Sequence, residues 1–477
     1  MRKLGWLALS VGVAGFAVAP ACGTDDSAFD DGGGNGGDAT SPFGDGSNPF
    51  GDAGPGGDGQ VCTNLCLKQV NCSGGGTTSI SGTVYDPAGN LPLYNVAVYV
   101  PNAPLSPITH GATCDQCGST LSGDPLVATL TDTAGHFELD DVPVTDNLPV
   151  VIQVGKWRRT FTVPTITQCA DNPITDPTLT RLATKPQETS PDDDIPQIAL
   201  TTGGADALEC LLPLIGIASD QFTGTSGTGR VNLYQGNGGS QLSGGSASAT
   251  SFWADNGAAN TNALTSYDMV MLGCEGNTYP NEKPTAALQA MEAYANAGGR
   301  VFGTHYHYYW IQSDPSPSLW PTTATWDHGN NPPQTNWNVT IDQTFAKGQA
   351  FAQWMLNVGA STTLGTFPIS QGRHDVDAVN GQPPTDPVSI QWVYGTNPNI
   401  VEYYSFNTPV GNTADQQCGK VVFSDLHVAA GDNVGGTFPG NCKNKTLTAQ
   451  EKALVFLLFD LSSCIQNDKQ PPPPPVH

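Results

Sequence analysis

Five of the eight histidines gather in one part of the chain, and they are the residues best suited to chemistry. They are His305, His307, His328, His374 and His427. His305 and His307 alternate after the apolar run RVFGT, so on a strand-like segment they would face one side. Asp425 and His427 alternate in the same way after GKVVFS. Two neighbouring strand ends could therefore bring together two or three imidazoles and a carboxylate.

Such a set can serve two kinds of chemistry. It fits a metal such as zinc, which binds imidazole and carboxylate ligands. It fits equally a general acid–base pair that acts on a polyol. The alternative is that these side chains satisfy buried polar groups beneath a long loop. The sequence contains no HExxH or similar motif, so we assign no metal ligand and no cofactor.

Further candidates stand beside the histidines. Glu275 follows the apolar run YDMVMLGC and is a second candidate base, although it could instead complement the charge of a helix N-terminus. Aromatic side chains interleave with the histidines, and flat rings beside polar groups suit sugars, although they also form ordinary core. The predicted catalytic residues are Glu275, His305 and His427. The predicted ligand-binding residues are His307, Tyr306, Trp310 and Asp425.

A strand, a helix and a second strand must position these side chains. Tyr267 to Gly273 is an apolar run without alternation, which is typical of a strand buried on both faces. Residues 284–296 place apolar side chains at helical spacing, and Gly298-Gly299 then ends the helix. Arg300 to Thr304 is the next strand. Such a unit belongs to a parallel sheet, in which ligands bind beyond the carboxyl ends of the strands.

Residues 61–183 have the pattern of a small β-sandwich, with short runs rich in Val, Ile, Thr and Phe between turn residues. SGTVYDPAGNLPLYNVAVYVP followed by LTDTAGHFELDDVPV resembles the carboxypeptidase regulatory-like domain, a transthyretin-like sandwich. The resemblance implies an accessory module, which in some relatives is grouped with carbohydrate-binding-like folds. Residues 184–194 are polar and predict a linker.

Residues 195–466 predict a three-layer α/β domain with a mostly parallel sheet. Their YDMVML strand, GGRVFGTHYHYYW segment and late GKVVFSDLHV strand resemble the class I glutamine-amidotransferase-like fold, and within it the ThuA-like domains. Glutaminases of this fold carry a nucleophilic cysteine at the elbow after the equivalent strand. This sequence has Thr304 and His305 there, so the resemblance does not imply glutamine hydrolysis.

The ends of the chain predict export. Residues 1–22 have the basic start and short apolar core of a signal peptide, and VAPAC resembles a bacterial lipobox that ends at Cys22. The resemblance implies lipidation of Cys22, a lipid anchor and an outer membrane lipoprotein of the myxobacterial type. Cleavage after Ala21, with secretion, is the alternative. Residues 23–60 are rich in Gly and Asp and predict a disordered tether, while residues 467–477 predict a disordered proline-rich tail.

Charge and cysteine content narrow the classes of partner and compartment. The formal net charge of −25 argues against nucleic acid, because phosphates require a basic surface. Eleven of the 12 cysteines remain when Cys22 is set aside. In an oxidising compartment most of them should form disulfides, with at least one thiol free or paired between the two regions.

These observations favour an envelope or secreted protein that binds a carbohydrate or a related polar ligand. One alternative is a sugar-processing hydrolase or isomerase that uses His305, Glu275 and His427. Another is a disulfide-rich surface interaction protein without an active site. A tight cluster of His305, His307 and His427 would favour the enzyme, whereas dispersed histidines under a closed loop would favour the interaction protein.

Overall fold

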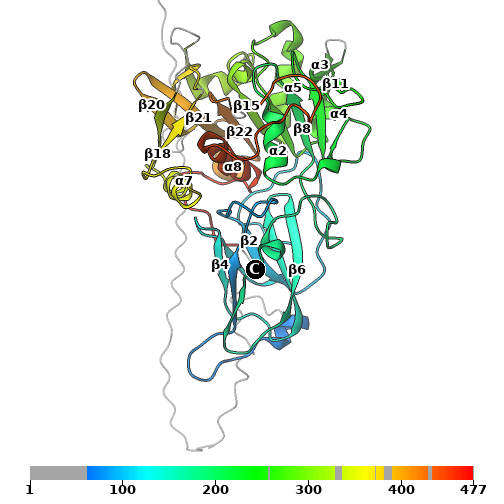
Figure 1. The fold of residues 1–477 in the computed structure, drawn as a ribbon, viewed down its shortest axis with the longest axis vertical. Coiled ribbons are helices and arrows are strands. Elements are labelled where there is room, and N and C mark those ends of the chain that lie inside the picture. The colour runs from blue at the N-terminus through cyan, green and yellow to red at the C-terminus, as the bar shows by residue number, and fades with distance from the viewer. Residues whose placement is uncertain are drawn as a thin grey trace, which may run out of the picture. The chain divides into compact units, whose positions relative to one another are not determined.

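The computed structural model describes residues 62–255, 258–327, 336–370, 372–380, 389–427 and 432–475. Cys22, the predicted signal peptide and tether, and His328 lie outside these ranges. Within them the chain is rich in strands and divides into two regions of different architecture (Figure 1). The expectation of a multidomain fold is therefore confirmed, and the fold is rich in strands. Among the described helices, none combines the length and the apolar character that crossing a membrane requires.

The first region is a sandwich of two small sheets with the orders β4-β1-β7 and β3-β2-β5-β6. Leu148, Val150 and Ile152 alternate along one strand and are all buried, because successive side chains of a strand point to opposite faces. The elements of this region are β1 (Ser79–Thr83), β2 (Ala97–Pro101), β3 (Pro125–Leu130), β4 (His136–Leu139), β5 (Asp146–Val154), β6 (Trp157–Thr165), β7 (Asp171–Ile174) and helix α1 (Pro177–Thr180).

The second region is built on one sheet of 11 strands, in the order β11-β10-β8-β14-β15-β22-β21-β20-β17-β18, with β9 paired to β10. Neighbours from β11 to β22 are parallel, and neighbours from β22 to β18 are antiparallel. With β9–β10 included, six of the ten neighbouring pairs are parallel, and a block of four antiparallel pairs completes the sheet. The strands are β8 (Ile198–Thr202), β9 (Phe222–Thr223), β10 (Val231–Gln235), β11 (Ala247–Ser248), β14 (Met269–Leu272), β15 (Arg300–Thr304), β17 (Trp337–Ile341), β18 (Thr366–Ile369), β20 (Ile390–Thr396), β21 (Asn399–Thr408) and β22 (Gly419–Ser424). Two further ribbons pair β12 (Ala254–Asp255) with β13 (Ala258–Ala259), and β16 (Ala324–Trp326) with β19 (Val376–Val379).

Helices cover both faces of this sheet. Met269 and Met271 belong to one apolar cluster with α2 (Leu211–Leu214), α7 (Ala346–Asn357) and α8 (Ala449–Ser462). Val270 and Leu272 belong to the other cluster, which includes side chains of α3 (Ala249–Trp253), α4 (Thr261–Thr265), α5 (Thr285–Asn296) and α6 (Tyr308–Gln312). Burial on both sides explains why this stretch of sequence is apolar without alternation.

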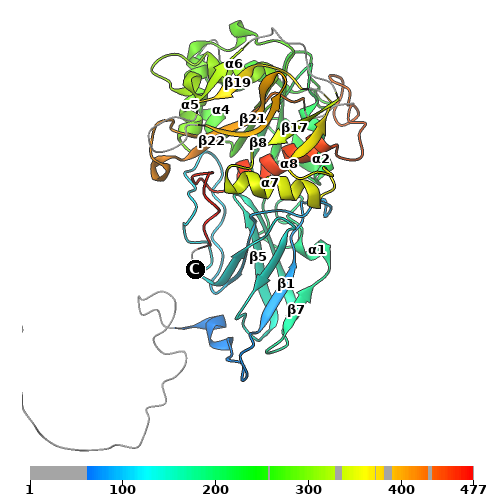
Figure 2. The same ribbon diagram turned by 90° about the vertical axis from the view of Figure 1, so that its left-hand side faces the viewer.

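The sandwich packs directly against the helices on one face of the large sheet. Figure 2 shows α7 and α8 between the two regions. Tyr94 of the sandwich stacks on Phe456 with ring centroids 5.9 Å apart, and Trp157 lies 5.2 Å from Phe459. Both phenylalanines belong to α8, so this helix contributes side chains to the cores of both regions.

Five disulfides are present, and the expectation for the cysteines is confirmed. Cys114–Cys418 and Cys117–Cys464 join the sandwich loop 102–124 to the second region. Cys274 is the free cysteine of the described chain. The remaining pairs are Cys62–Cys66, Cys72–Cys169 and Cys210–Cys442.

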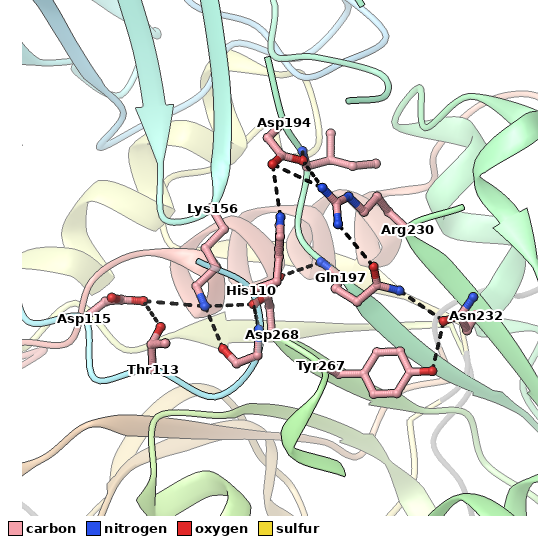
Figure 3. Close-up of polar contacts among 12 residues, drawn as sticks. His110, Thr113, Asp115, Lys156, Asp194, Gln197, Arg230, Asn232, Tyr267 and Asp268 are labelled. Atoms are coloured by element: carbon pink, nitrogen blue, oxygen red, sulfur yellow. Dashed lines mark hydrogen bonds and ion pairs between the residues drawn. The ribbon is translucent and has the colours of Figure 1, made fainter. Parts of the chain in front are cut away.

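Charged side chains fasten the same loop to the amino ends of the central strands (Figure 3). His110 contacts Asp268 through Nδ1 at 2.7 Å and Asp194 through Nε2 at 3.0 Å. Lys156, in the turn between β5 and β6, donates to Asp268 at 2.8 Å, and Arg230 donates to Asp194 at 2.9 Å. These five residues are called the latch below.

Candidate functional site

Three chemically reactive side chains meet at the carboxyl ends of adjacent parallel strands. Cys274 follows β14, His305 follows β15, and His427 follows β22. His305 Nδ1 lies 3.4 Å from Cys274 Sγ and 3.2 Å from His427 Nε2. The expectation that His305 and His427 share one edge of the sheet is therefore confirmed. We call Cys274, His305 and His427 the strand-end cluster.

A sharp turn of the backbone places the His305 ring. The strand ends at Thr304, and His305 has a φ of +43°, a left-handed conformation that is strained for any residue except glycine. A 3-10 turn over His305–His307 follows and leads into α6. Backbone strain of this kind concentrates at functional sites, where the surrounding structure enforces it.

His307 does not occupy an equivalent position, because the strand-like segment expected here is a 3-10 turn. Its ring is 2% exposed, with Nε2 donating to the Gly273 carbonyl at 2.9 Å and Nδ1 accepting from Trp310 Nε1 at 3.1 Å. Burial, with the charge of Lys283, lowers the pKa of His307 to about 4. His307 and Trp310, both predicted to bind ligand, form a neutral, buried pair that ties the turn to β14.

Glu275 has its own partners away from the strand-end cluster. It is 4% exposed and accepts hydrogen bonds from Lys283 Nζ at 2.8 Å and from the Asn237 backbone at 2.9 Å. Burial would raise the pKa of Glu275, but His307, Lys283 and these hydrogen bonds outweigh burial and hold it below its ordinary value. The structure gives Glu275 no hydrogen bond to His305 or His427 within the described chain. An ion-paired carboxylate of this kind is poorly placed to act as the predicted base.

Three residues that the sequence did not suggest complete the surroundings of the histidines. Arg373 lies 3.2 Å from His427 Nδ1, and Asp375 Oδ2 lies 3.6 Å from His305 Nε2. The predicted residue Asp425 is fully buried and accepts from the Asp375 backbone N–H at 2.6 Å, so it anchors this segment. Glu402 of β21 is fully buried, and the backbone of Arg373 lies beside its carboxyl group.

Burial keeps the strand-end cluster neutral. It lowers the pKa of His305 to about 2, with His427 and Arg373 adding to the effect, and lowers the pKa of His427 to about 3. It raises the pKa of the Cys274 thiol to about 12. It also raises the pKa of Asp375 to about 6 and that of Glu402 well above its ordinary value. Neutral imidazoles can both donate and accept hydrogen bonds.

A row of partly exposed aromatic rings begins at His305. Tyr306 lies against the His305 ring with centroids 4.1 Å apart, Tyr308 follows at 6.3 Å from Tyr306, and Trp326 at 6.1 Å from Tyr308. We call Tyr306, Tyr308 and Trp326 the aromatic shelf. Only Tyr306 was predicted to bind ligand. The alternation of aromatic and polar residues in HYHYYW was the signal that could also have pointed to Tyr308.

The sequence carried only weak signals for the site residues that it did not predict. Cys274 stands between the strand and Glu275, and an odd number of cysteines indicated that one thiol would be free. Arg373 and Asp375 flank His374 in QGRHDVDAV, but nothing local connects them with residues 305 or 427. His374 itself contacts Asp377 at 2.8 Å and belongs to a separate group with Asp327 and Asp377.

Comparison with known proteins leaves the family open. No protein-family model and no curated protein matches the chain. Among solved structures, a ThuA-like protein of Bacteroides uniformis is 12% identical, with a TM-score of 0.30, over 55% of this chain and 88% of that chain. A type II cohesin–X-dockerin complex of Acetivibrio cellulolyticus is 15% identical, with a TM-score of 0.15, over 32% of this chain and 78% of that chain. A 9R-lipoxygenase of Cyanothece is 20% identical, with a TM-score of 0.13, over 23% of this chain and 19% of that chain. These scores are too low to carry an argument about fold or function.

Proposed function

We propose that this chain is an exported envelope protein that binds a carbohydrate or a related polar ligand at the strand-end cluster. The observation that carries the proposal is the position of His305. Its side chain is 13% exposed, it contacts His427 and Cys274, and its ring lies tilted against the ring of Tyr306, the first residue of the aromatic shelf. In this proposal the second region is a three-layer, ThuA-like α/β domain, as the sequence resemblance implies.

The chemistry of a sugar matches this arrangement in two ways. A pyranose has an apolar face that packs against flat aromatic rings, which the aromatic shelf supplies. Its hydroxyl groups donate and accept hydrogen bonds, and His305 Nε2 can pair with one of them, because its 3.6 Å contact with Asp375 Oδ2 is longer than a hydrogen bond. Burial holds the imidazoles in their uncharged form, so they suit a neutral ligand.

Acid–base turnover of such a ligand is the second candidate function. The contact between His305 Nε2 and Asp375 Oδ2 at 3.6 Å favours it, since a carboxyl group orients an imidazole for proton transfer. In that case His305, His427 and Asp375 would carry the reaction as hydrolase or isomerase. Glu275 would remain outside it, because Lys283 holds it as a carboxylate.

A binding panel tests the proposal. Neutral monosaccharides and disaccharides are titrated into the full chain, with calorimetry and tryptophan fluorescence as readouts, the latter sensitive to Trp326. We expect His305→Ala and Tyr306→Ala each to weaken binding by about tenfold or more. His136→Ala is the matched control, because His136 is an exposed histidine of the sandwich. Absence of sugar binding, or binding that survives His305→Ala, would favour the third candidate, an interaction protein without an active site.

The proposed location is the outer membrane, through a lipid on Cys22. The five disulfides support export to an oxidising compartment. Cys22→Ser should move the protein from the membrane fraction to the soluble fraction, because the substitution removes the lipidated sulfur. Fractionation of the wild type and the variant after expression in a bacterial host checks this. Identical fractionation of the two would contradict the lipoprotein proposal.

A further inference from the structure

We propose that Cys274 Sγ, His305 Nδ1 and His427 Nε2 bind a thiophilic transition metal, Zn²⁺ first among them, and leave its fourth position open. The site is that of the proposed function, but the metal proposal does not depend on carbohydrate binding. The three ligand atoms come from three adjacent strand ends and lie within 4.8 Å of one another. Cysteine and histidine together form the donor set that zinc prefers.

The spacing of the three atoms agrees with a metal centre. A tetrahedral zinc with bonds of about 2.0–2.1 Å to nitrogen and about 2.3 Å to sulfur holds its ligand atoms roughly 3.3–3.6 Å apart. Cys274 Sγ lies 3.4 Å from His305 Nδ1, the two nitrogens lie 3.2 Å apart, and Cys274 Sγ lies within 4.8 Å of His427 Nε2. Hydrogen bonds alone explain the close approach of these three atoms less well than a bound metal does. The single lone pair of His305 Nδ1 cannot accept well from both the thiol and the second imidazole.

The surroundings of the sulfur also suit a bound cation. Cys274 Sγ accepts a hydrogen bond from the Gly276 backbone N–H at 3.4 Å, and the Tyr306 backbone hydrogen-bonds to it as well. Backbone N–H donors directed at sulfur also stabilise a metal-bound thiolate, which forms when a metal ion displaces the proton of the buried thiol. The other ten cysteines of the described chain are all in disulfides, so Cys274 alone keeps a sulfur available.

Arg373 sets the affinity of the site in this proposal. A guanidinium group can only donate, so its 3.2 Å contact requires His427 Nδ1 to accept and leaves the proton on Nε2. A metal at Nε2 needs that lone pair and moves the proton to Nδ1, where it faces Arg373. Histidine ligands of zinc usually direct this second N–H at a carboxylate or carbonyl. Arg373 therefore competes with the metal.

Three protein ligands and an open position are typical of catalytic rather than structural zinc sites. A metal there would act as a Lewis acid on a ligand that stacks on the aromatic shelf. The chain's own residues would fix the ligand's orientation, with Tyr306 beside His305 and Asp375 behind it.

Cobalt titration of the metal-free, tag-free full chain tests the proposal. Co²⁺ bound through a thiolate gives a sulfur-to-cobalt charge-transfer band in the near ultraviolet, and Zn²⁺ should abolish it by displacement. We expect one such ion per chain. Cys274→Ser should remove the band, and His427→Gln should weaken cobalt binding by about tenfold or more. Circular dichroism and thermal melts check that each variant is folded. Two variants are used so that, if one fails to fold, the other still tests the proposal.

Asp377→Asn is the matched control. Asp327, His374 and Asp377 form a second group that could hold a cation, but they contain no sulfur and cannot give the charge-transfer band. This variant should keep the band unchanged. A missing band in the wild type, or a band that persists in Cys274→Ser, would overturn the proposal.

Arg373→Gln tests whether the arginine lowers the metal affinity of the site. Glutamine can accept from His427 Nδ1–H through its carbonyl oxygen, so the variant should bind cobalt about tenfold more tightly. Equal or weaker cobalt binding would overturn the assignment of Arg373.

Repeating the sugar titration with metal-free and metal-loaded protein keeps the metal proposal and the sugar-binding proposal distinct. Sugar binding by a chain that takes no metal refutes this inference alone, and metal binding by a chain that takes no sugar refutes the proposed function alone.

Discussion

His305 and His307 are two residues apart, yet their surroundings give them opposite physical roles. His307 is buried, and both of its nitrogens have partners in the turn that follows β15. His305 is partly exposed, adopts a strained backbone, and shares its Nδ1 with Cys274 and His427. The first arrangement stabilises the fold, whereas the second leaves a reactive nitrogen at the sheet edge.

Substitution should separate the two roles. His307→Ala should lower the free energy of unfolding by about 3 kcal/mol, because it leaves a buried cavity and strands the Trp310 N–H. His305→Ala should change it by less than about 1 kcal/mol, since the ring is not fully buried and the backbone strain remains. Urea unfolding followed by circular dichroism measures both. Similar losses in the two variants would mean that His305 is also structural.

The sequence could predict where the site lies but not how its residues pair. Parallel strands bring their carboxyl ends to one edge, so His305 and His427 could be placed together from the pattern alone. Lys283 neutralises Glu275 from eight residues away, and Arg373 reaches His427 from a distant segment. Such pairings depend on loops whose course no local periodicity reports, and they decide which acidic or basic group remains available.

Among the elements, α8 connects the most parts of the molecule. Thr448 and Glu451 form a capping box at its start, and Phe456 and Phe459 pack on the sandwich. Near its end, Asp460 joins Asp468 in a buried ion network with Lys347 and Lys420, with distances of 2.7–2.9 Å. Asp468 lies within the range predicted to be a disordered tail, but it is 3% exposed.

Asp468 should therefore matter to stability although it lies near the C-terminus. Asp468→Ala removes one of two anions that neutralise two buried lysines, and breaking such a network costs about 3–5 kcal/mol. Lys469→Ala, at the exposed neighbouring position, should stay within about 0.5 kcal/mol of the wild type. Chemical denaturation of both variants checks this. A loss of less than about 1 kcal/mol in Asp468→Ala would show that the ion network contributes little.

Helix α5 and the parallel central strands could be predicted from the sequence. The pairing of the antiparallel strands could be predicted less well. The helix expected over residues 284–296 forms α5. The antiparallel strands β20 and β21 carry bulges, which break the alternation from which pairing is inferred. The buried partners of Asp468 lie 121 and 48 residues away, beyond the reach of any local pattern.

In the molecule as a whole, loop 102–124 holds the sandwich and the second region together. Cys114–Cys418 and Cys117–Cys464 span 304 and 347 residues of sequence, and both tie this loop to the second region. Because their ends lie close together in sequence, each bond shortens the loop that the other closes to about 50 residues, and the entropic stabilisation per bond is then about 4 kcal/mol.

Removing the two bonds should be more costly than the sum of the single removals. Each pairwise replacement by alanine should cost about 4 kcal/mol, but losing both opens a loop of about 300 residues and should cost about 10 kcal/mol. Removing Cys62–Cys66, which spans four residues, should cost about 2 kcal/mol. Denaturant unfolding of the three variants and their combination gives the comparison. Strict additivity would show that the loop-closure account does not apply.

The latch should make the stability of the molecule depend on pH. Both nitrogens of His110 face carboxylates, Asp268 and Asp194, so both must carry protons (Figure 3). Burial alone would lower the pKa of His110, but these two carboxylates outweigh burial and the repulsion from Arg230, and they raise it. A histidine with a raised folded pKa stabilises the fold fully below its unfolded pKa of about 6.5, and this contribution is lost as pH rises through the folded pKa.

The contribution of His110 to the free energy of unfolding should therefore fall as pH increases above about 6.5. The folded pKa values of Asp194 and Asp268 lie below their ordinary values, so both remain ionised over this range, and Lys156 continues to neutralise Asp268. His305, His307 and His427 have lowered folded pKa values, so near pH 6.5 they oppose this trend, because the unfolded chain still binds protons there; above about pH 7.5 they contribute nothing. His110→Gln should be less stable than the wild type near pH 6, and the difference between the two proteins should shrink as pH rises. Urea unfolding at intervals between pH 6 and pH 9 measures both curves, and parallel curves would show that His110 is not the group whose deprotonation weakens the latch.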